Sequence, residues 1–538
     1  MSRRSIFLIE CSAPHWVDVV RLLEQSGVTV TKWTAWTHAK GNIPASIFHD
    51  TIDAKRGLDQ YGRKPTSLEF DEACEKVWRE DAQTIYDMMN KFDPNRDQSF
   101  LERSALFVDH LCLWRDELSR ARPDLVVFPA PPHVVYDYIL LALCRALSIP
   151  TLMFEEITIL PPYSLAMPDY RIGPKITLGH YPISDETKTI VARLRGDYAM
   201  AKPAREVAAE REKRETMKNN REAIAKLVNE TKIADQKHRG KYGDNQKLIN
   251  ITSLVKERNV PLRNSFSGDF ANTRYIDQLA ANIEDVEHLR GIYESLQTSE
   301  LPRNFIYVPL AGQPERTSNP QADIHANQLL MIRHIAAGKP KDWGIVVKEH
   351  PNQFSPHFAG GTCRDAEYYP AIAAMGATIV STSTDPFTLI DRAGVVATTG
   401  GTVALEATAR GKRSMLFGDA WYRDCPGVTR VRTQADVRTF FSGIIGKPDI
   451  IPGDHTDLAD DGKRSTSMIG AAEHVRGPTS EQFEDYIESL RHFGFEGIAD
   501  YPPQDYPMDP QKNVENLTRE VLKRIQSNPS IEEKKTSS

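Results

Sequence analysis

The sequence lacks a cysteine pattern, a long apolar run and a large excess of charge of either sign. Its 538 residues include only 6 cysteines, which are scattered and form no CxxC pair, so neither a zinc site nor a disulfide framework is predicted. No apolar stretch approaches the roughly 20 residues that cross a bilayer. The net charge of -6 gives no support to broad nucleic-acid binding. These absences predict a protein of a reducing cytoplasm.

Several catalytic signatures are also missing. The chain contains no GxGxxG, GxxxxGK[ST], GxSxG or HExxH stretch. Nicotinamide chemistry, P-loop hydrolysis, serine hydrolysis and zinc peptidase chemistry therefore lose their usual sequence support. The first apolar run is short and is broken by Glu10, which predicts a strand and not a signal peptide.

What the chain does contain is a regular alternation of strand and helix patterns. Near the start, strands are predicted at 5–10, 28–36, 124–130 and 151–156, with helices between them and a mostly helical stretch over 65–120. From residue 305 the strands "FIYVPL", "WGIVVKEH", "ATIVST", "VVATT" and "RSMLFG" alternate with helices, one of them over 322–338. Such alternation predicts parallel sheets with helices on both faces, in two doubly wound α/β domains.

Four regions are predicted along the chain. Residues 1–180 form a Rossmann-like domain, 181–300 a charged helical insertion or linker, 301–477 a second Rossmann-like domain, and 478–538 helices that pack back on the first domain. The stretch 201–250 is dense in charged residues and has no Phe or Trp, so it is expected to be solvated. Contact between its basic side chains and anionic lipid is the alternative.

Polar residues stand at the ends of neighbouring predicted strands in the second domain. In open α/β sheets, ligands bind at the carboxyl ends of the strands. Lys348, His350 and Pro351 end the strand "WGIVVKEHP", and Ser383 follows the strand "ATIVST". A plain strand end is the competing interpretation for each of them.

The turn after "VVATT" has the chemistry of a phosphate site. Gly400 and Gly401 allow backbone to approach a ligand closely, and Thr402 is predicted to cap the next helix, whose free N–H groups favour an anion. Glu406 lies one helical turn later and offers two oxygens to the hydroxyls of a ribose. The alternative is an ordinary tight turn with a solvent-facing glutamate.

Two adjacent carboxylates end the strand at 151–156 in the first domain. Because neighbouring strand residues point to opposite faces, one of Glu155 and Glu156 is expected to face the cleft. Each carboxylate raises the pKa of the other, which suits a general base; a charged strand end is the alternative. His133 is a candidate acceptor-binding residue in the same domain.

Three stretches, "YVPLAGQPERTSNPQAD", "VVKEHPNQF" and "ATTGGTVALEATARGKRSMLFGDAWY", resemble the capsule polysaccharide biosynthesis family, which includes the retaining β-Kdo transferases. The resemblance is strongest over 305–425 and weaker over 124–165, where "TLMFEEI" has Ile157 in place of the family's usual Gly. It implies a GT-B fold, in which two Rossmann-like domains face a cleft and C-terminal helices cross back. It also implies a donor site in the second domain and no need for a metal ion or cofactor.

The resemblance assigns roles to residues already singled out. His350 would contact the donor phosphate, Ser383, Gly401 and Thr402 would line the phosphate and base region, and Glu406 would bind ribose. Gln313 and Glu315 would shape the donor pocket, and Glu155 or Glu156 would be the acidic catalytic residue.

The function that this resemblance implies is a glycosyltransferase of surface or capsular polysaccharide biosynthesis with a nucleotide-activated, CMP-linked and Kdo-like sugar donor. The acceptor would be a glycan or glycolipid, and the protein would be cytoplasmic, with peripheral contact to the inner membrane or the capsule assembly machinery. Two alternatives stay open. One is a UDP-sugar 2-epimerase or CDP-glycerol-type transferase on the same fold, and the other is a non-catalytic polysaccharide-assembly protein.

Overall fold

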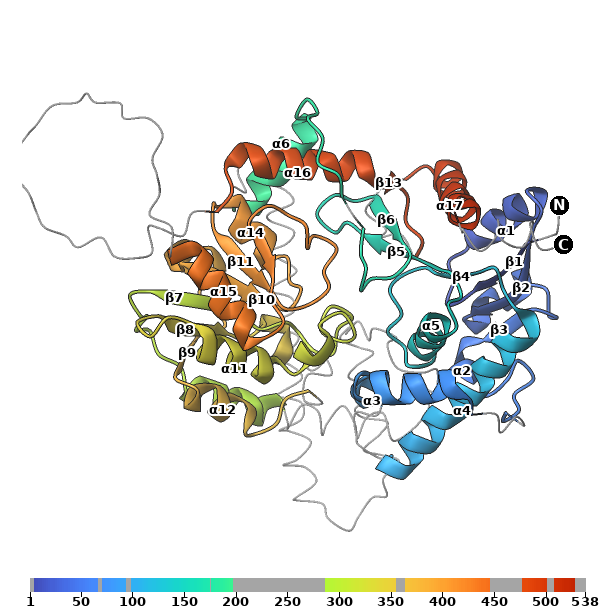
Figure 1. Cartoon of the computed structure of the whole chain (residues 1–538), viewed down its shortest axis with the longest axis horizontal. Helices are drawn as coiled ribbons and strands as arrows, with labels where there is room; N and C mark the ends of the chain where they lie inside the picture. The colour runs from blue at the N-terminus through green and yellow to red at the C-terminus, as the bar shows by residue number, and fades with distance from the viewer. Residues whose placement is uncertain are drawn as a thin grey trace, which may run out of the picture.

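The computed structural model describes residues 4–65, 70–92, 98–174, 176–196, 286–354, 363–445, 477–500 and 508–527. Most of the expected charged insertion, including its densest stretch at 201–250, lies outside these residues. Figure 1 shows two α/β domains side by side, with the N-terminal strands in one and strands β7–β12 in the other.

The first domain is built on a seven-stranded sheet with the order β13-β6-β5-β4-β1-β2-β3. Its strands are β1 (Arg4–Leu8), β2 (Val28–Ala35), β3 (Phe48–Asp50), β4 (Leu125–Phe128), β5 (Thr151–Glu156), β6 (Tyr163–Met167) and β13 (Phe495–Glu496). The order β3-β2-β1-β4-β5 is that of a Rossmann domain, and these five strands are parallel.

The edge of this sheet differs from the all-parallel prediction. Strand β6 is antiparallel to β5, and β13 is antiparallel to β6. The reason is the short connection of residues 157–162 between β5 and β6, which is too short for the helical crossover that a parallel neighbour needs.

Helices cover both faces of the first sheet. They are α1 (Trp16–Gln25), α2 (Thr51–Lys55), α3 (Glu72–Phe92), α4 (Phe100–Ala121) and α5 (Tyr136–Ala146), with a 3-10 turn η1 (Thr37–Asn42). Helix α6 (Asp185–Leu194) packs instead against α14 (Val403–Ala409) and α16 (Ser480–Phe493). Helix α4 begins at a capping box in which Ser99 and Glu102 satisfy each other's backbone N–H groups. Helix α1 turns Trp16, Val19 and Leu23 inward at helical spacing.

The second domain holds a six-stranded parallel sheet with the order β12-β11-β10-β7-β8-β9. Its strands are β7 (Phe305–Pro309), β8 (Gly344–Lys348), β9 (Ala377–Val380), β10 (Val395–Thr398), β11 (Arg413–Leu416) and β12 (Val428–Arg430). Counted from β7, this is again the Rossmann order 3-2-1-4-5-6. The predicted fold, two Rossmann-like doubly wound domains in a GT-B-like arrangement, is therefore confirmed.

The helices of the second domain are short. They are α11 (Gln328–Gly338), α12 (Tyr368–Ala374), α13 (Pro386–Arg392), α14 (Val403–Ala409) and α15 (Gln434–Ile445), with 3-10 turns η2 (Asp323–Ala326) and η3 (Pro351–Phe354) and a helical stretch at 286–295. The single helix predicted over 322–338 is thus wrong. Asn327 accepts a hydrogen bond from the N–H of Leu329, which starts α11 afresh after the 3-10 turn.

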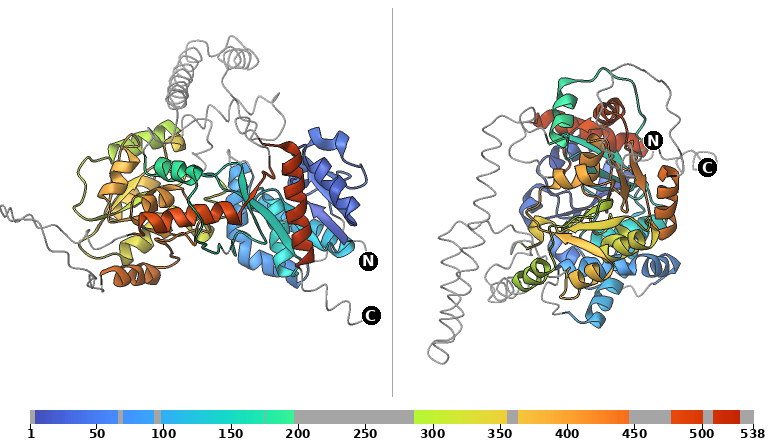
Figure 2. Two further views of the ribbon diagram at one scale, coloured as in Figure 1. Left: turned by 90° about the horizontal axis from the view of Figure 1, so that it is seen from above. Right: turned by 90° about the vertical axis from the view of Figure 1, so that its left-hand side faces the viewer.

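The C-terminal segment crosses between the domains. Helix α16 (Ser480–Phe493) runs along both, and α17 (Pro510–Gln526) lies beside α1 of the first domain (Figures 1 and 2). Between them β13 joins the first sheet, and the indole of Trp16 donates a hydrogen bond to the carbonyl of Ala499 at 2.8 Å.

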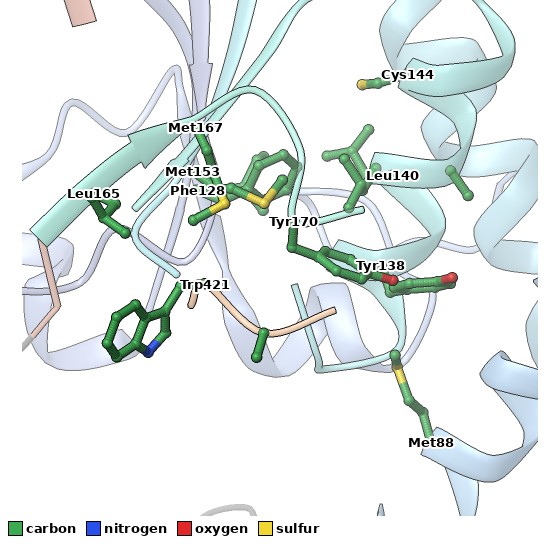
Figure 3. Packing of buried hydrophobic residues seen from close by; sticks show 14 of the residues in the cluster. Met88, Phe128, Tyr138, Leu140, Cys144, Met153, Leu165, Met167, Tyr170 and Trp421 are labelled. Atoms are coloured by element: carbon green, nitrogen blue, oxygen red, sulfur yellow. The ribbon is translucent and has the colours of Figure 1, made fainter. Parts of the chain in front are cut away.

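One apolar cluster joins the two domains. It contains residues of β4, β5, β6 and α5 from the first domain and of α14, β11 and the loop after β11 from the second. Figure 3 shows Trp421 of that loop in the same cluster as Met153, Leu165 and Met167 of the first domain. The buried contact holds the carboxyl ends of strands from both sheets at one cleft.

Candidate active site

A cleft with a volume of about 550 Å³ lies between the domains. Most of its wall comes from the carboxyl ends of β7, β8 and β10, where the strand order of the second sheet reverses. Glu155 and Thr158 close it from the first domain. A ligand is expected at such a reversal point, because adjacent loops diverge there and leave a crevice.

The strand end "KEHP" divides its side chains between the cleft and the protein interior. Lys348, His350 and Pro351 line the cleft. Glu349 is fully buried and pairs with Arg364, from Nε to Oε2 at 3.0 Å, and accepts a hydrogen bond from the hydroxyl of Tyr369 at 2.8 Å. The charged strand end is therefore a packed ion pair on one face and a cleft wall on the other.

The turn after β10 has fewer free N–H groups than the sequence predicts. The hydroxyl of Thr398 accepts from the N–H groups of Gly400 and Gly401 at 3.4 and 3.1 Å, as a threonine at a turn often does. Thr402 occupies the predicted N-cap position, but its side chain makes no capping hydrogen bond. Its hydroxyl bonds to Glu406 instead, one helical turn away.

Glu406, Thr402 and the two glycines all line the cleft. Burial raises the pKa of Glu406, while the Thr402 hydrogen bond and the charge of Lys348 oppose that rise. Glu315 also lines the cleft, and burial raises the pKa of its carboxyl against the opposing charges of His350 and Lys91. Two carboxylates that can accept hydrogen bonds from hydroxyl groups therefore stand beside cationic side chains.

Gln313 and Ser383 lie elsewhere than the sequence predicts. Gln313 does not line the cleft, because its side chain is used inside the domain: it donates to the carbonyl of Ala326 and accepts from Gln328 and Arg364. Ser383 is exposed, lies outside the cleft wall, and shares a hydrogen bond of 2.8 Å with Ser381. Gln313 thus supports the loop after β7 and does not shape the pocket directly.

Glu155 and Glu156 point to opposite sides, as alternation along a strand requires. Glu155 is 2% exposed, lines the cleft, and accepts from Arg316 at 2.7 Å and from Gln321 at 3.0 Å. Glu156 is half-buried and does not line the cleft. Burial, and not mutual repulsion, is the main cause that raises the pKa of each carboxyl.

His133 lies in the loop after β4, outside the cleft wall. Its Nδ1 is 3.0 Å from the carbonyl of Pro131, and burial lowers its pKa to about 3, so the ring is neutral near pH 7. Asp137 follows it and accepts from the N–H groups of His133 and Val134. The structure therefore gives His133 a place in a buried turn.

Sequence reasoning missed two arginines. Arg316 stands next to Glu315 in the stretch "QPER", where only the Gln and the Glu were selected. Arg364 is 15 positions from Glu349, and no local pattern joins the two. A buried carboxylate needs a cation, but the sequence does not say which one.

Two kinds of feature are absent from the described ranges. No helix there is both long and apolar enough to span a membrane. In the same ranges, no group of three or more His, Cys, Asp or Glu side chains is arranged to hold a metal ion.

Comparison with solved structures finds distant similarity over most of the chain. The UDP-GlcNAc 2-epimerase of Neisseria meningitidis bound to UDP-GlcNAc is 10% identical, covering 98% of this chain and 100% of its own, with a TM-score of 0.20. The spinosyn rhamnosyltransferase SpnG is 12% identical, covering 90% of this chain and 96% of its own, with a TM-score of 0.21. The N-terminal domain of a Candida albicans trehalose-6-phosphate phosphatase is 11% identical, with 97% of each chain covered and a TM-score of 0.25. TM-scores this low do not support a fold assignment, which rests instead on the strand orders of the two sheets.

The sequence comparison is narrower. No curated protein matches the chain. Residues 313–443 match the family described as "Capsule polysaccharide biosynthesis protein", and this stretch contains most of the wall that the second domain contributes to the cleft.

Proposed function

We propose that this protein is a glycosyltransferase of surface or capsular polysaccharide biosynthesis that uses a nucleotide-activated, CMP-linked sugar. One observation carries the proposal: the stretch that matches the capsule family forms the main wall of a cleft that Glu155 of the other domain closes. A carboxylate opposite that wall stands where a general base could take the proton of an acceptor hydroxyl.

The donor would lie on the second domain. Its phosphate would contact Lys348 and His350, and its ribose hydroxyls would bind Glu406. Aromatic side chains in the wall, Phe387, Trp421 and Tyr422 among them, offer faces on which a base can stack. The cationic side chains would stabilise the leaving phosphate without a metal ion.

Glu155 is the better candidate for the general base, because it alone of the pair lines the cleft. In the proposed step the acceptor hydroxyl loses its proton to Glu155, and its oxygen forms a bond to the anomeric carbon. The bond from that carbon to the phosphate oxygen breaks, and its electron pair leaves with the nucleotide. Raising the pKa of Glu155 by burial brings it closer to the working pH of a base.

The alternatives predict different ligands. A UDP-sugar 2-epimerase would prefer UDP, and a CDP-glycerol-type transferase would prefer CDP. A non-catalytic assembly protein would bind a nucleotide or glycan without releasing sugar. Peripheral contact with the inner membrane stays a prediction, since the basic segment 201–250 that would make it lies outside the described residues.

Calorimetric binding of CMP, CDP, UDP and GDP to the purified protein tests the proposal. We expect CMP to bind most tightly and His350→Ala to weaken it by about tenfold or more, the value of a hydrogen bond to a charged group. His180→Ala is the matched control, because its side chain is fully exposed and lies outside the cleft wall. Preference for UDP or CDP would move the assignment to the alternatives, and the absence of binding to all four nucleotides would overturn it.

A further inference from the structure

Both carboxylate oxygens of Glu155 are held by the opposite domain. Arg316 donates from Nη2 to Oε1 at 2.7 Å, and Gln321 donates from Nε2 to Oε2 at 3.0 Å. Both donors belong to the loop after β7, whereas Glu155 ends β5 of the first domain. Two residues of the second domain therefore engage the candidate base directly.

Arg316 is also part of the cleft wall. Its side chain is 23% exposed, and its only hydrogen bond to the residues that the structure describes uses Nη2. The other guanidinium nitrogens can therefore donate to a second acceptor on the cleft side. A guanidinium presents its donors in a planar fork that matches the oxygens of a phosphate.

The charges of the cleft wall make Arg316 important for an anionic ligand. The wall contains Glu155, Glu315 and Glu406, whereas its fixed cations are Arg316 and Lys348. Glu349 also borders the cleft, but Arg364 neutralises it. Lys348 already lies in the field of Glu406. A phosphate that enters such a cleft needs a further cation. Among the described residues that line the cleft, Arg316 is the arginine.

We propose that Arg316 exchanges between two anionic partners. It holds Glu155 before the donor binds. When the donor binds, the guanidinium turns to the donor phosphate and releases Glu155 to act on the acceptor. The inference rests on the proposed function and adds to it a coupling between donor binding and the readiness of the base. Arg316 would be a binding residue for the phosphate and a positioning residue for Glu155.

This exchange has a consequence for protons. The groups that face Glu155 are Arg316 and Arg423, which lower its pKa, the Gln321 amide, which lowers it, and Glu156, which raises it. When Arg316 turns away from Glu155, fewer groups oppose the rise in pKa that burial causes, so the pKa of Glu155 rises further. Nucleotide binding should therefore take up protons near that pKa, and the carboxylate that stays ionised becomes a stronger base.

The test uses the full-length protein and CMP, with binding measured by calorimetry. Arg316→Gln removes the cation and should weaken CMP binding by about tenfold or more. Glu155→Gln removes the competing anion, so CMP no longer has to displace it and should bind roughly three- to tenfold more tightly. Arg21→Gln, at an exposed ion pair on α1, is the control and should leave binding unchanged.

Proton uptake gives a second readout. Repeating the CMP titration at several pH values, each in buffers of different ionisation enthalpy, measures the protons taken up by the wild-type protein. Glu155→Gln should abolish the part that belongs to Glu155 and leave the part that belongs to the phosphate of CMP. Thermal unfolding of each variant shows whether it is folded.

The outcomes separate the inference from the proposed function. Opposite changes in affinity for the two variants, together with proton uptake that depends on Glu155, support the exchange. Weaker binding in both variants would mean that the pair only holds the domains together and would overturn it, as would unchanged binding in Arg316→Gln. If the wild-type protein binds no nucleotide, the proposed function fails and the inference fails with it.

Discussion

The pair formed by Glu349 and Arg364 offers the sharpest test of how the donor wall is held in place. Both side chains are fully buried, and Nε lies 3.0 Å from Oε2. Arg364 also donates to Gln313 and to the carbonyl of Ala311, so it connects the end of β8 to the loop after β7. Breaking the pair should therefore destabilise both cleft-lining segments.

The size of the expected loss of stability follows from the groups that stay buried when one partner is removed. In Arg364→Met, Glu349 keeps the Tyr369 hydroxyl and the N–H of His350 as donors but loses its cation. Breaking a buried pair on one side costs about 3–5 kcal/mol, and the two remaining donors place this case near 3 kcal/mol. Glu349→Gln in the same background removes the stranded charge, so the double variant should be less destabilised than the sum of the single variants by about 2 kcal/mol.

Urea denaturation of the wild type, both single variants and the double variant measures this coupling, with CMP binding measured in parallel. Arg392→Met is the control: Arg392 is exposed on α13 of the same domain, and its replacement should cost less than about 0.5 kcal/mol. A cost below about 1 kcal/mol for Arg364→Met, or strict additivity in the double variant, would refute the reasoning.

Two further predictions concern the backbone and the pH dependence of stability. A Cβ at Gly418 would lie 1.9 Å from the carbonyl oxygen of Thr399, so Gly418→Ala should shift the turn after β10, cost about 1–3 kcal/mol of stability and weaken nucleotide binding. Gly443→Ala is the control, because a Cβ there would have nothing within 4 Å, and it should have none of these effects. Equal stability of the two variants in urea would contradict this prediction. Burial and the charge of Glu10 raise the pKa of Asp137 to about 7. The folded-state pKa exceeds the unfolded one, so the protonated Asp137 carboxyl contributes its full stabilisation of the fold below about pH 4. That contribution is lost as the pH rises through 7, by up to about 4 kcal/mol relative to Asp137→Asn. Urea denaturation from pH 4 to 8 should show a widening difference, and a constant one would count against the assignment.

Local patterns in the sequence predicted the repeating elements well. Apolar runs separated by helical patterns are visible along the chain, so the two doubly wound domains followed from periodicity alone. Local chemistry also accounts for some helix starts: Asp385 caps α13 by accepting from the N–H of Thr388, with Pro386 at the first helical position. Such features depend on neighbours within a few residues, which the sequence shows directly.

The edge of the first sheet depended on more than local pattern. β13 pairs with β6 although more than 300 residues separate them. Its two residues carry no periodicity, and only the path of α16 across both domains brings them to the sheet edge. Such a pairing cannot be predicted from a repeating pattern.

The site was determined by the sequence and the tertiary structure in different respects. The sequence alone placed His350, the Gly400–Gly401 turn and Glu406 at the same edge of one sheet, because a parallel sheet brings all its carboxyl ends to one edge. Only the tertiary structure decided that Glu155 faces the cleft, that Arg316, 161 positions away, holds it, and that Gln313 turns inward. The physical reason is that a strand pattern fixes which face a side chain occupies, whereas its charge partner depends on which distant loop the packed domains bring within 3 Å.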